Sequence, residues 1–199
     1  MDRCHQEDAP AFSIFLFCPF EMCPLDDDRE ALDKEAGNLS YSLKTLGRIL
    51  MMKIGGSMGP LYGKFFCAIS KTLEDKQEIG IAEYNEAFQA ALADIRKISP
   101  AQVGDKTLMD VLIPSAATMD QAVADGKSFQ EALDEMCAAA EAGRDSTIDM
   151  VAKIGRSSRL GERSRGVMDA GSASCCLIIC YSLNICAITI IVSISIRLF

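Results

Sequence analysis

The clearest pattern along the chain is an apolar stripe of helical period in residues 81–98. Apolar side chains recur there at positions i, i+4, i+7, i+8 and i+11, and acidic side chains occupy the opposite face. This spacing is typical of an amphipathic α-helix, which Ser99-Pro100 would end because proline disfavours helical backbone in the residue before it. The stripe consists of Tyr84, Phe88, Ala91, Leu92 and Ile95.

A second helix is predicted between Ser128 and Gly143. Ser128 and Glu131 have the spacing of a capping box, in which the two side chains satisfy backbone N–H groups at the helix start. The apolar positions that follow share one face, and glycine commonly follows the last residue of a helix. The predicted buried stripe is Phe129, Leu133, Met136, Cys137 and Ala140.

Similar patterns predict further helices at 40–54, 60–75, 106–122 and 144–154, and Pro114 would kink the third of these. No alternating strand pattern occurs outside the isoleucine-rich C-terminal segment, and no internal repeat is visible. The predicted fold is therefore an all-α bundle of amphipathic helices joined by short loops.

The two ends of the chain differ from this helical middle. Residues 1–29 are a poorly defined segment whose apolar run is too short to span a membrane and whose acidic start does not suit a secretory signal. Residues 170–196 carry no charge, and 175–196 are long and apolar enough for a transmembrane helix. A buried C-terminal helix of the bundle is the alternative, and both stay open. The predicted layout is a helical domain at 30–175 followed by an apolar helix or tail at 176–199.

Charge and cysteine content narrow the classes of partner. The 199-residue chain has a formal net charge of −8 and no strong basic stripe, so nucleic acid is not expected to bind. A small anion is compatible if the few cations converge. The nine cysteines are odd in number and form no spaced framework, which predicts reduced thiols and a cytoplasmic location. With His5 as the single histidine, a zinc site is not expected.

Residues 55–63 contain four glycines between two predicted helices. Because glycine lacks a Cβ and tolerates positive φ, such a turn can aim consecutive N–H groups at a phosphate, with the positive end of the next helix behind them. Close packing of two helices also selects small residues, and this is the competing interpretation.

Two downstream segments bear on that choice. The first is Val103-Gly104-Asp105-Lys106-Thr107, at the start of a predicted helix that Asp105 or Thr107 can cap. The second is residues 155–171, which place four arginines, at 156, 159, 163 and 165, within ten residues of an acidic chain. A guanidinium matches phosphate oxygens through two parallel hydrogen bonds, so this enrichment indicates an anion clamp. A solvated basic loop is the alternative.

In this order the three segments resemble the nucleotide-binding L subunit of dihydroxyacetone kinases, equivalent to the C-terminal domain of the single-chain enzymes. The matching motifs are GGSMGPLYGKFF at 55–66, VGDKTLMDVLIP at 103–114 and GRSSRLGERSRGVMDAGSAS at 155–174. The resemblance covers roughly residues 30–175. It implies a barrel of antiparallel amphipathic helices with ADP or ATP bound at one end.

The resemblance also implies which residues bind the nucleotide. Ser57 and Met58 would contact its phosphates, Gly104 would lie against it, and Arg156 would reach toward it. Residues 169–171 match the family's Asp-Pro-Gly segment, with alanine in place of proline. The full implied set is Gly55, Gly56, Ser57, Met58, Gly59, Gly104, Thr107, Arg156, Asp169, Ala170 and Gly171.

The chain departs from the family at the magnesium ligands. The family reads LDREIGDADHG there and binds two magnesium ions through three aspartates, whereas this chain reads LDKEAG at 32–37 followed by Asn38-Leu39-Ser40. Asp33 is the acidic ligand that is retained, and Asn38 and Ser40 offer neutral oxygens. The acidic run at 26–28 is more simply a solvated turn. The 16 residues between Asn38 and Gly55 span about 24 Å as one helix, so one N-terminal helix of the family is predicted to be missing.

Three functional hypotheses follow, and none assigns a catalytic residue to this chain. The first is a phosphotransferase domain that passes phosphate from ATP, or from a phosphocarrier protein through bound ADP, to dihydroxyacetone held by a partner K subunit or domain. Its activity would be weak because the magnesium site is incomplete. The second is a non-catalytic ADP/ATP-binding regulatory protein that docks on such a subunit. The third is a tail-anchored helical protein, held in a membrane through 175–196. The substrate-binding histidine belongs to the partner, so His5 is not assigned to it.

Overall fold

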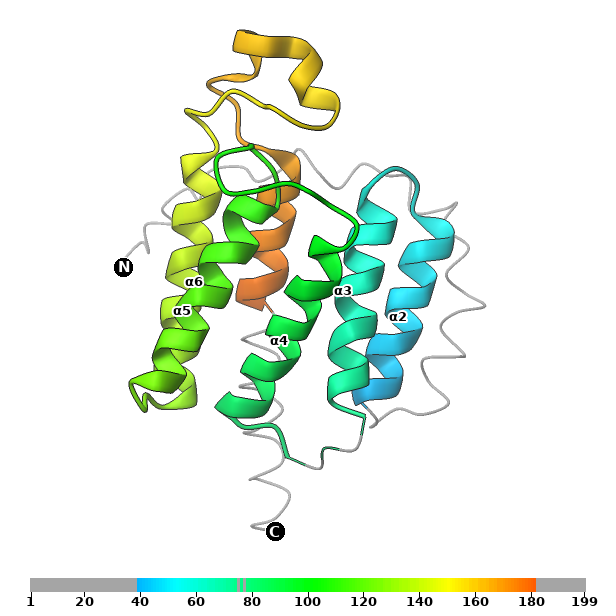
Figure 1. Ribbon diagram of the computed structural model, residues 1–199, viewed down its shortest axis with the longest axis vertical. Helices are drawn as coiled ribbons and strands as arrows, with labels where there is room; N and C mark the ends of the chain where they lie inside the picture. Colours follow the sequence, from blue (N-terminus) through cyan, green and yellow to red (C-terminus); the bar gives the residue numbers. More distant parts are fainter. Residues whose placement is uncertain (1–38, 75, 77, 182–199) are drawn as a thin grey trace, which may run out of the picture.

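The computed structural model describes residues 39–74, 76 and 78–181, and no strand occurs among them, which confirms the all-α prediction (Figure 1). A helix also covers 170–181. The other elements are α2 (Leu39–Lys53), α3 (Met58–Thr72), α4 (Ile81–Arg96), α5 (Met109–Ala124), α6 (Phe129–Ser146) and the 3-10 segment η2 (Arg156–Ser164).

Consecutive helices from α2 to α6 pack side by side and run antiparallel (Figure 1). The helix at 170–181 then returns to contact both α3 and α6. On the α3 side, the hydroxyl oxygens of Tyr62 and Ser174 lie 2.8 Å apart. On the α6 side, a disulfide joins Cys137 to Cys180. The described helices therefore form a bundle around one core.

The core confirms the two stripes predicted from periodicity. In α4, Phe88, Ala91, Leu92 and Ile95 are buried, and Tyr84 packs against them from the edge. In α6, Leu133, Met136 and Ala140 are buried, while Phe129 and Cys137 are partly buried at the margin. Aromatic contacts connect the helices, because the ring of Phe88 meets that of Phe65 on α3 edge to face, with centroids 5.6 Å apart.

Small residues set the distance between α2 and α3. A Cβ placed on Gly47 would lie 2.8 Å from the carbonyl oxygen of Gly63, and the reverse contact is equally short. A Cβ on Gly59 would lie 2.7 Å from the carbonyl oxygen of Leu50. Helix packing therefore accounts for two of the four glycines at 55–63, namely Gly59 and Gly63.

The predicted helix at 144–154 is wrong. The helix that begins at Phe129 runs through Gly143 to Ser146, and residues 147–154 are turn and irregular backbone. Gly143 lies inside this helix and allows close packing on α5, since a Cβ there would collide with the backbone of Asp110. After Ser146, the N–H groups of Thr147 and Ile148 bond within the last turn, and that of Lys153 donates to the carbonyl of Asp105 over 3.2 Å. Pro114 lies inside α5 without interrupting it.

The prediction of reduced thiols is wrong for Cys137 and Cys180, whose Cα atoms are 5.2 Å apart in the disulfide. Their separation of 43 residues hid this pairing, which arises only when the helix at 170–181 packs on α6. Cys67, Cys175 and Cys176 are free thiols. The remaining cysteines, at 4, 18, 23 and 186, lie outside the described residues.

None of the described helices has the length and apolar character needed to cross a membrane. The described part of the C-terminal apolar stretch packs within the bundle, with Cys175, Cys176 and Ile179 buried. Residues 182–199 and the N-terminal segment 1–29 lie outside the described part of the chain.

Candidate functional site

The three sequence motifs meet at one end of the bundle. The turn between α2 and α3, the loop between α4 and α5, the η2 segment and the start of the helix at 170–181 all lie there, at the top of Figure 1. Residues more than 100 positions apart make contact at this end: the hydroxyl of Tyr62 donates to the carbonyl of Gly171 over 3.3 Å. This end of the bundle is therefore the candidate site.

The turn before α3 supplies an exposed, glycine-shaped backbone. Gly56 has a φ of 74°, which favours glycine, and Gly55, Ser57 and Met58 are exposed beside it. A Cβ at Gly56 would lie 4.0 Å from the nearest guanidinium nitrogen of Arg156, so the arginine segment reaches across to this turn. The N-terminus of α3, where the N-cap residue Ser57 makes no side-chain capping hydrogen bond, follows directly.

The loop before α5 is held by Asp110, a residue that the motif interpretation missed. The Asp110 side chain is buried, at 1% exposed, and its carboxylate accepts the N–H groups of Gly104 over 2.5 Å and Thr107 over 2.7 Å. Those two N–H groups are thus already satisfied. The signal was present in the sequence, because Thr107 and Asp110 have the three-residue spacing of a capping box.

Asp169 begins the helix at 170–181. Its carboxylate accepts the N–H of Ser172 over 2.7 Å, and its own N–H donates to the hydroxyl of Thr147. Burial raises the pKa of the Asp169 carboxyl, and the nearby charge of Asp110 adds to this rise, against opposing hydrogen bonds from Ser172 and Gly171. Ala170 is exposed at the first turn of that helix.

Positive side chains surround this end of an otherwise acidic chain. Lys153 lies over the second loop, with its ammonium 3.4 Å from a carboxylate oxygen of Asp105. The η2 segment projects its arginines into solvent. The exposed cations here are Lys53, Lys153, Arg156, Arg159, Arg163 and Arg165. An anion approaching this end therefore meets several positive charges within one surface.

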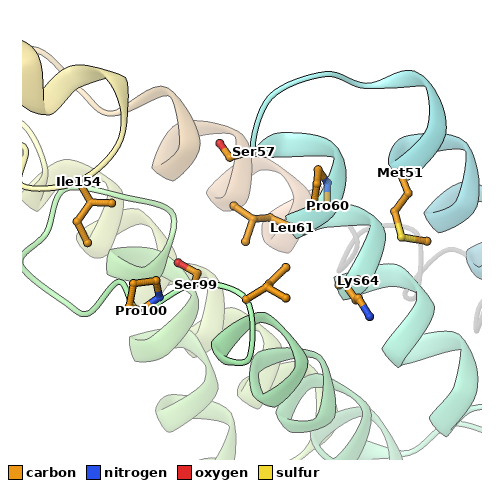
Figure 2. Close-up of a pocket in the computed structure, with 9 residues that line it drawn as sticks. Met51, Ser57, Pro60, Leu61, Lys64, Ser99, Pro100 and Ile154 are labelled. Carbon is orange, nitrogen blue, oxygen red and sulfur yellow. The ribbon is translucent and has the colours of Figure 1, made fainter.

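An apolar hollow of about 520 Å³ lies beside the glycine turn (Figure 2). Ser57 at its edge belongs to that turn, and Ile154 on the other side is two residues from Arg156. Its lining residues are Met51, Ser57, Pro60, Leu61, Lys64, Ile98, Ser99, Pro100 and Ile154. The hollow thus adjoins the place where Arg156 approaches Gly56.

The described residues do not form a magnesium site at this end. No group of three or more acidic, cysteine or histidine side chains is placed to hold a metal in the part of the chain that the structure describes. Asp110 and Asp169 already accept backbone N–H groups. Ser40 lies at the far end of α2, about 20 Å from the turn at 1.5 Å per residue, and its hydroxyl donates to the carbonyl of Ser70. Asp33, Asn38 and the acidic run at 26–28 lie outside the described residues.

Comparison with known proteins shows the family of the region that carries the three motifs. The model of the DAK2 domain matches residues 27–184. The chain belongs to the DAK2 domain family. Within this family it is 34% identical, over 142 residues, to the PEP-dependent dihydroxyacetone kinase ADP-binding subunit DhaL of Escherichia coli, an alignment that covers 71% of this chain and 66% of that protein.

Two other relatives show the range of DAK2 proteins. The PTS-dependent dihydroxyacetone kinase ADP-binding subunit DhaL of Lactococcus lactis is 38% identical over 138 residues, which is 69% of this chain and 64% of that subunit. The Triokinase/FMN cyclase of Mus musculus is 29% identical over 144 residues, covering 71% of this chain and 25% of the mouse protein. This DAK2 chain thus aligns with about two thirds of the length of the separate subunits and a quarter of the longer enzyme.

Proposed function

We propose that this DAK2 domain binds ADP or ATP at the end of the bundle where its three motifs meet. The observation that supports this most directly is the approach of the Arg156 guanidinium to the Gly56 turn, at the N-terminus of α3. That arrangement offers a phosphate chain a cation on one side and backbone N–H groups on the other. Two of the relatives described above are named as ADP-binding subunits.

In this proposal the hollow beside Ser57 receives the nucleobase. Its lining is mostly apolar, and it adjoins the phosphate position between Gly56 and Arg156. An apolar wall can pack on the flat faces of a purine, while the few polar groups orient it. We further propose that Gly104, Thr107 and residues 169–171 complete the site, as the motifs imply.

As a member of a dihydroxyacetone kinase family, the chain is proposed to act in phosphoryl transfer to dihydroxyacetone held by a separate K subunit or domain. The names of the bacterial relatives as PEP-dependent and PTS-dependent support a phosphocarrier protein as the source of the phosphoryl group. A partner that presents the substrate must approach the nucleotide end. Exposed apolar side chains are available there for such docking, among them Met52, Val103 and Val167.

A non-catalytic ADP/ATP-binding role is the second candidate, and the shortage of metal-binding carboxylates among the described residues favours it. Phosphoryl transfer requires divalent ions on the β and γ oxygens, and the described residues offer no converging set of free carboxylates. Ser40 is committed to Ser70 at the other end of α2. We infer that nucleotide binding by this chain does not depend on magnesium.

The test is isothermal titration of the full chain with ADP, with and without magnesium, for the wild type and Arg156→Ala. Loss of one guanidinium–phosphate interaction should cost about 2 kcal/mol, which is roughly a 30-fold weaker Kd. Lys71→Ala is the control, because it removes one positive charge from the exposed surface near the opposite end of α3. The control should leave the Kd unchanged.

The outcomes separate the candidates. If the wild type binds ADP neither with nor without magnesium, both candidate functions are excluded. Binding that appears only with magnesium would contradict the metal-independent site and favour the phosphotransferase. Equal weakening by Arg156→Ala and Lys71→Ala would show a general charge effect instead of a phosphate contact at Arg156.

A further inference from the structure

Lys106 is the one residue other than glycine with a positive φ among those that the structure describes, at 62°. It lies in the loop between α4 and α5, one residue before Thr107, and only 4% of it is exposed. Lysine is almost never fully buried unless its ammonium has partners, so both features call for a specific interaction.

The Lys106 ammonium donates three hydrogen bonds to main-chain carbonyls. The acceptors are Met150 at 3.1 Å, Ser164 at 2.6 Å and Val167 at 2.7 Å. An ammonium has three N–H donors, so all of them are used. Its acceptors come from a region 44 to 61 residues further along the chain.

These three carbonyls lie before, at the end of and after η2 (Arg156–Ser164), called the arginine segment below. Met150 precedes it, Ser164 is its last residue, and Val167 comes two residues before Asp169. The segment has few apolar anchors of its own: Ser164 is the buried residue within η2. One buried ammonium thus joins the loop before α5 to both ends of the segment that carries Arg156.

We propose that Lys106 is a positioning residue for anion binding, which holds the 150–167 backbone so that Arg156 faces the Gly56 turn before any ligand arrives. This inference rests on the proposed function. Without the ammonium, three carbonyls would lose their common donor, and the arginine segment would have to be ordered during binding. Ordering at that moment lowers affinity, whereas a preorganised site avoids the cost.

The experiment combines nucleotide titration with hydrogen exchange on the full chain of Lys106→Met and Lys106→Arg. Lys106→Met keeps the apolar stem and removes the three donors. We expect at least a tenfold weaker ADP Kd, with faster amide exchange in 148–168 and unchanged exchange in α3 and α4. Lys106→Arg keeps the charge and N–H donors, so it should recover part of the affinity and of the protection.

The control is Met136→Val, a core change on α6 that lowers the melting temperature without touching the loops. It should leave the ADP Kd unchanged, because binding is measured well below the melting temperature. A Lys106→Met protein that binds ADP as the wild type does would overturn the proposal while the proposed function stands. A weaker Kd in Lys106→Met without faster exchange in 148–168 would also overturn it, because the loss of affinity would then not come from the position of that backbone.

Two further results keep the two proposals distinguishable. If the wild type fails to bind ADP, the proposed function fails and the binding role of Lys106 fails with it. If Lys106→Met does not fold, the decision falls to Lys106→Arg, whose planar guanidinium cannot reproduce three diverging contacts. That variant should then bind ADP more weakly and exchange faster in 148–168, and wild-type values for both would refute the proposal.

Discussion

The two ends of the bundle differ in the hydrogen bonds that hold the connections between helices. At the far end, the connections use neighbours in sequence: Glu83 accepts the N–H of Gly80, and Glu131 accepts that of Ser128, each three residues away. At the candidate site, Lys106 and Tyr62 bond to backbone 44 to 109 residues away. The far-end turns before α4 and α6 are thus held by local hydrogen bonds, whereas the site end has long-range bonds in addition to local ones.

This difference follows from what each end has to do. A far-end turn only reverses the chain, and a capping box is sufficient for that. The site end must hold cations and exposed N–H groups in fixed positions, although mutual repulsion and hydration would separate them. Two buried polar side chains provide this support: Asp110 bonds within its own loop, and Lys106 bonds to backbone 44 to 61 residues away. Substitutions at the two ends should therefore have different consequences.

The largest expected effect concerns the Cys137–Cys180 disulfide, a long-range cross-link between α6 and the helix at 170–181. In the chain-entropy model, a cross-link that closes a loop of 43 residues stabilises the folded state by about 4 kcal/mol. Reduction, or the Cys137→Ser variant, should lower the urea midpoint accordingly and leave the ADP Kd nearly unchanged in the folded range. An unchanged midpoint on reduction would show that the bundle is closed by packing without the cross-link.

Next in size is Asp110→Ala at the site end, compared with Ser128→Ala at the far end. Asp110→Ala leaves the partly buried N–H groups of Gly104 and Thr107 without their acceptor, which should cost about 3 kcal/mol of unfolding free energy and weaken ADP binding. Ser128→Ala removes a helix cap and should cost about 1 kcal/mol with no change in ADP Kd. Urea unfolding and titration measure both. Similar effects of the two variants on Kd would erase the contrast between the ends.

The smallest expected effect is a pH dependence from Asp169. Because burial raises its pKa in the folded state, the folded carboxyl keeps its proton where the unfolded one, with a pKa of about 4, has lost it. This contribution to stability is present at low pH and is lost as pH rises from about 4 through the raised pKa. Urea unfolding between pH 4 and 8 should show the wild type losing stability relative to Asp169→Asn. A constant difference, or one of opposite sign, would contradict the burial effect.

The sequence predicted the helices that local periodicity defines. The stripes of α4 and α6 and the Ser128 cap were recognisable because each depends on residues within two or three turns. The region after Ser146 was predicted as helix and is not: α6 ends with the C-cap Thr147, whose hydroxyl contacts that of Ser172 and accepts the N–H of Asp169. Such partners are not visible in a local window.

The candidate site was found from its motifs, but the tertiary structure divided their residues by role. Among the glycines at 55–63, Gly59 and Gly63 allow α2 and α3 to approach, whereas Gly56 shapes the exposed turn. The role of Lys106 appeared only when its distant partners were in place, whereas that of Asp110 depends on residues three and six positions away. Nothing in the local sequence distinguishes Gly59 and Gly63 from Gly56.

The sequence by itself determined the all-α class, the order of the motifs and membership of the DAK2 domain family, because periodicity and motif order are properties of neighbouring positions. The tertiary structure decided which segments touch: that Arg156 faces Gly56, that Cys137 meets Cys180, and that Ser40 lies away from the site. The physical reason is that these contacts depend on how helices pack against one another, and the packing is set by the whole core at once.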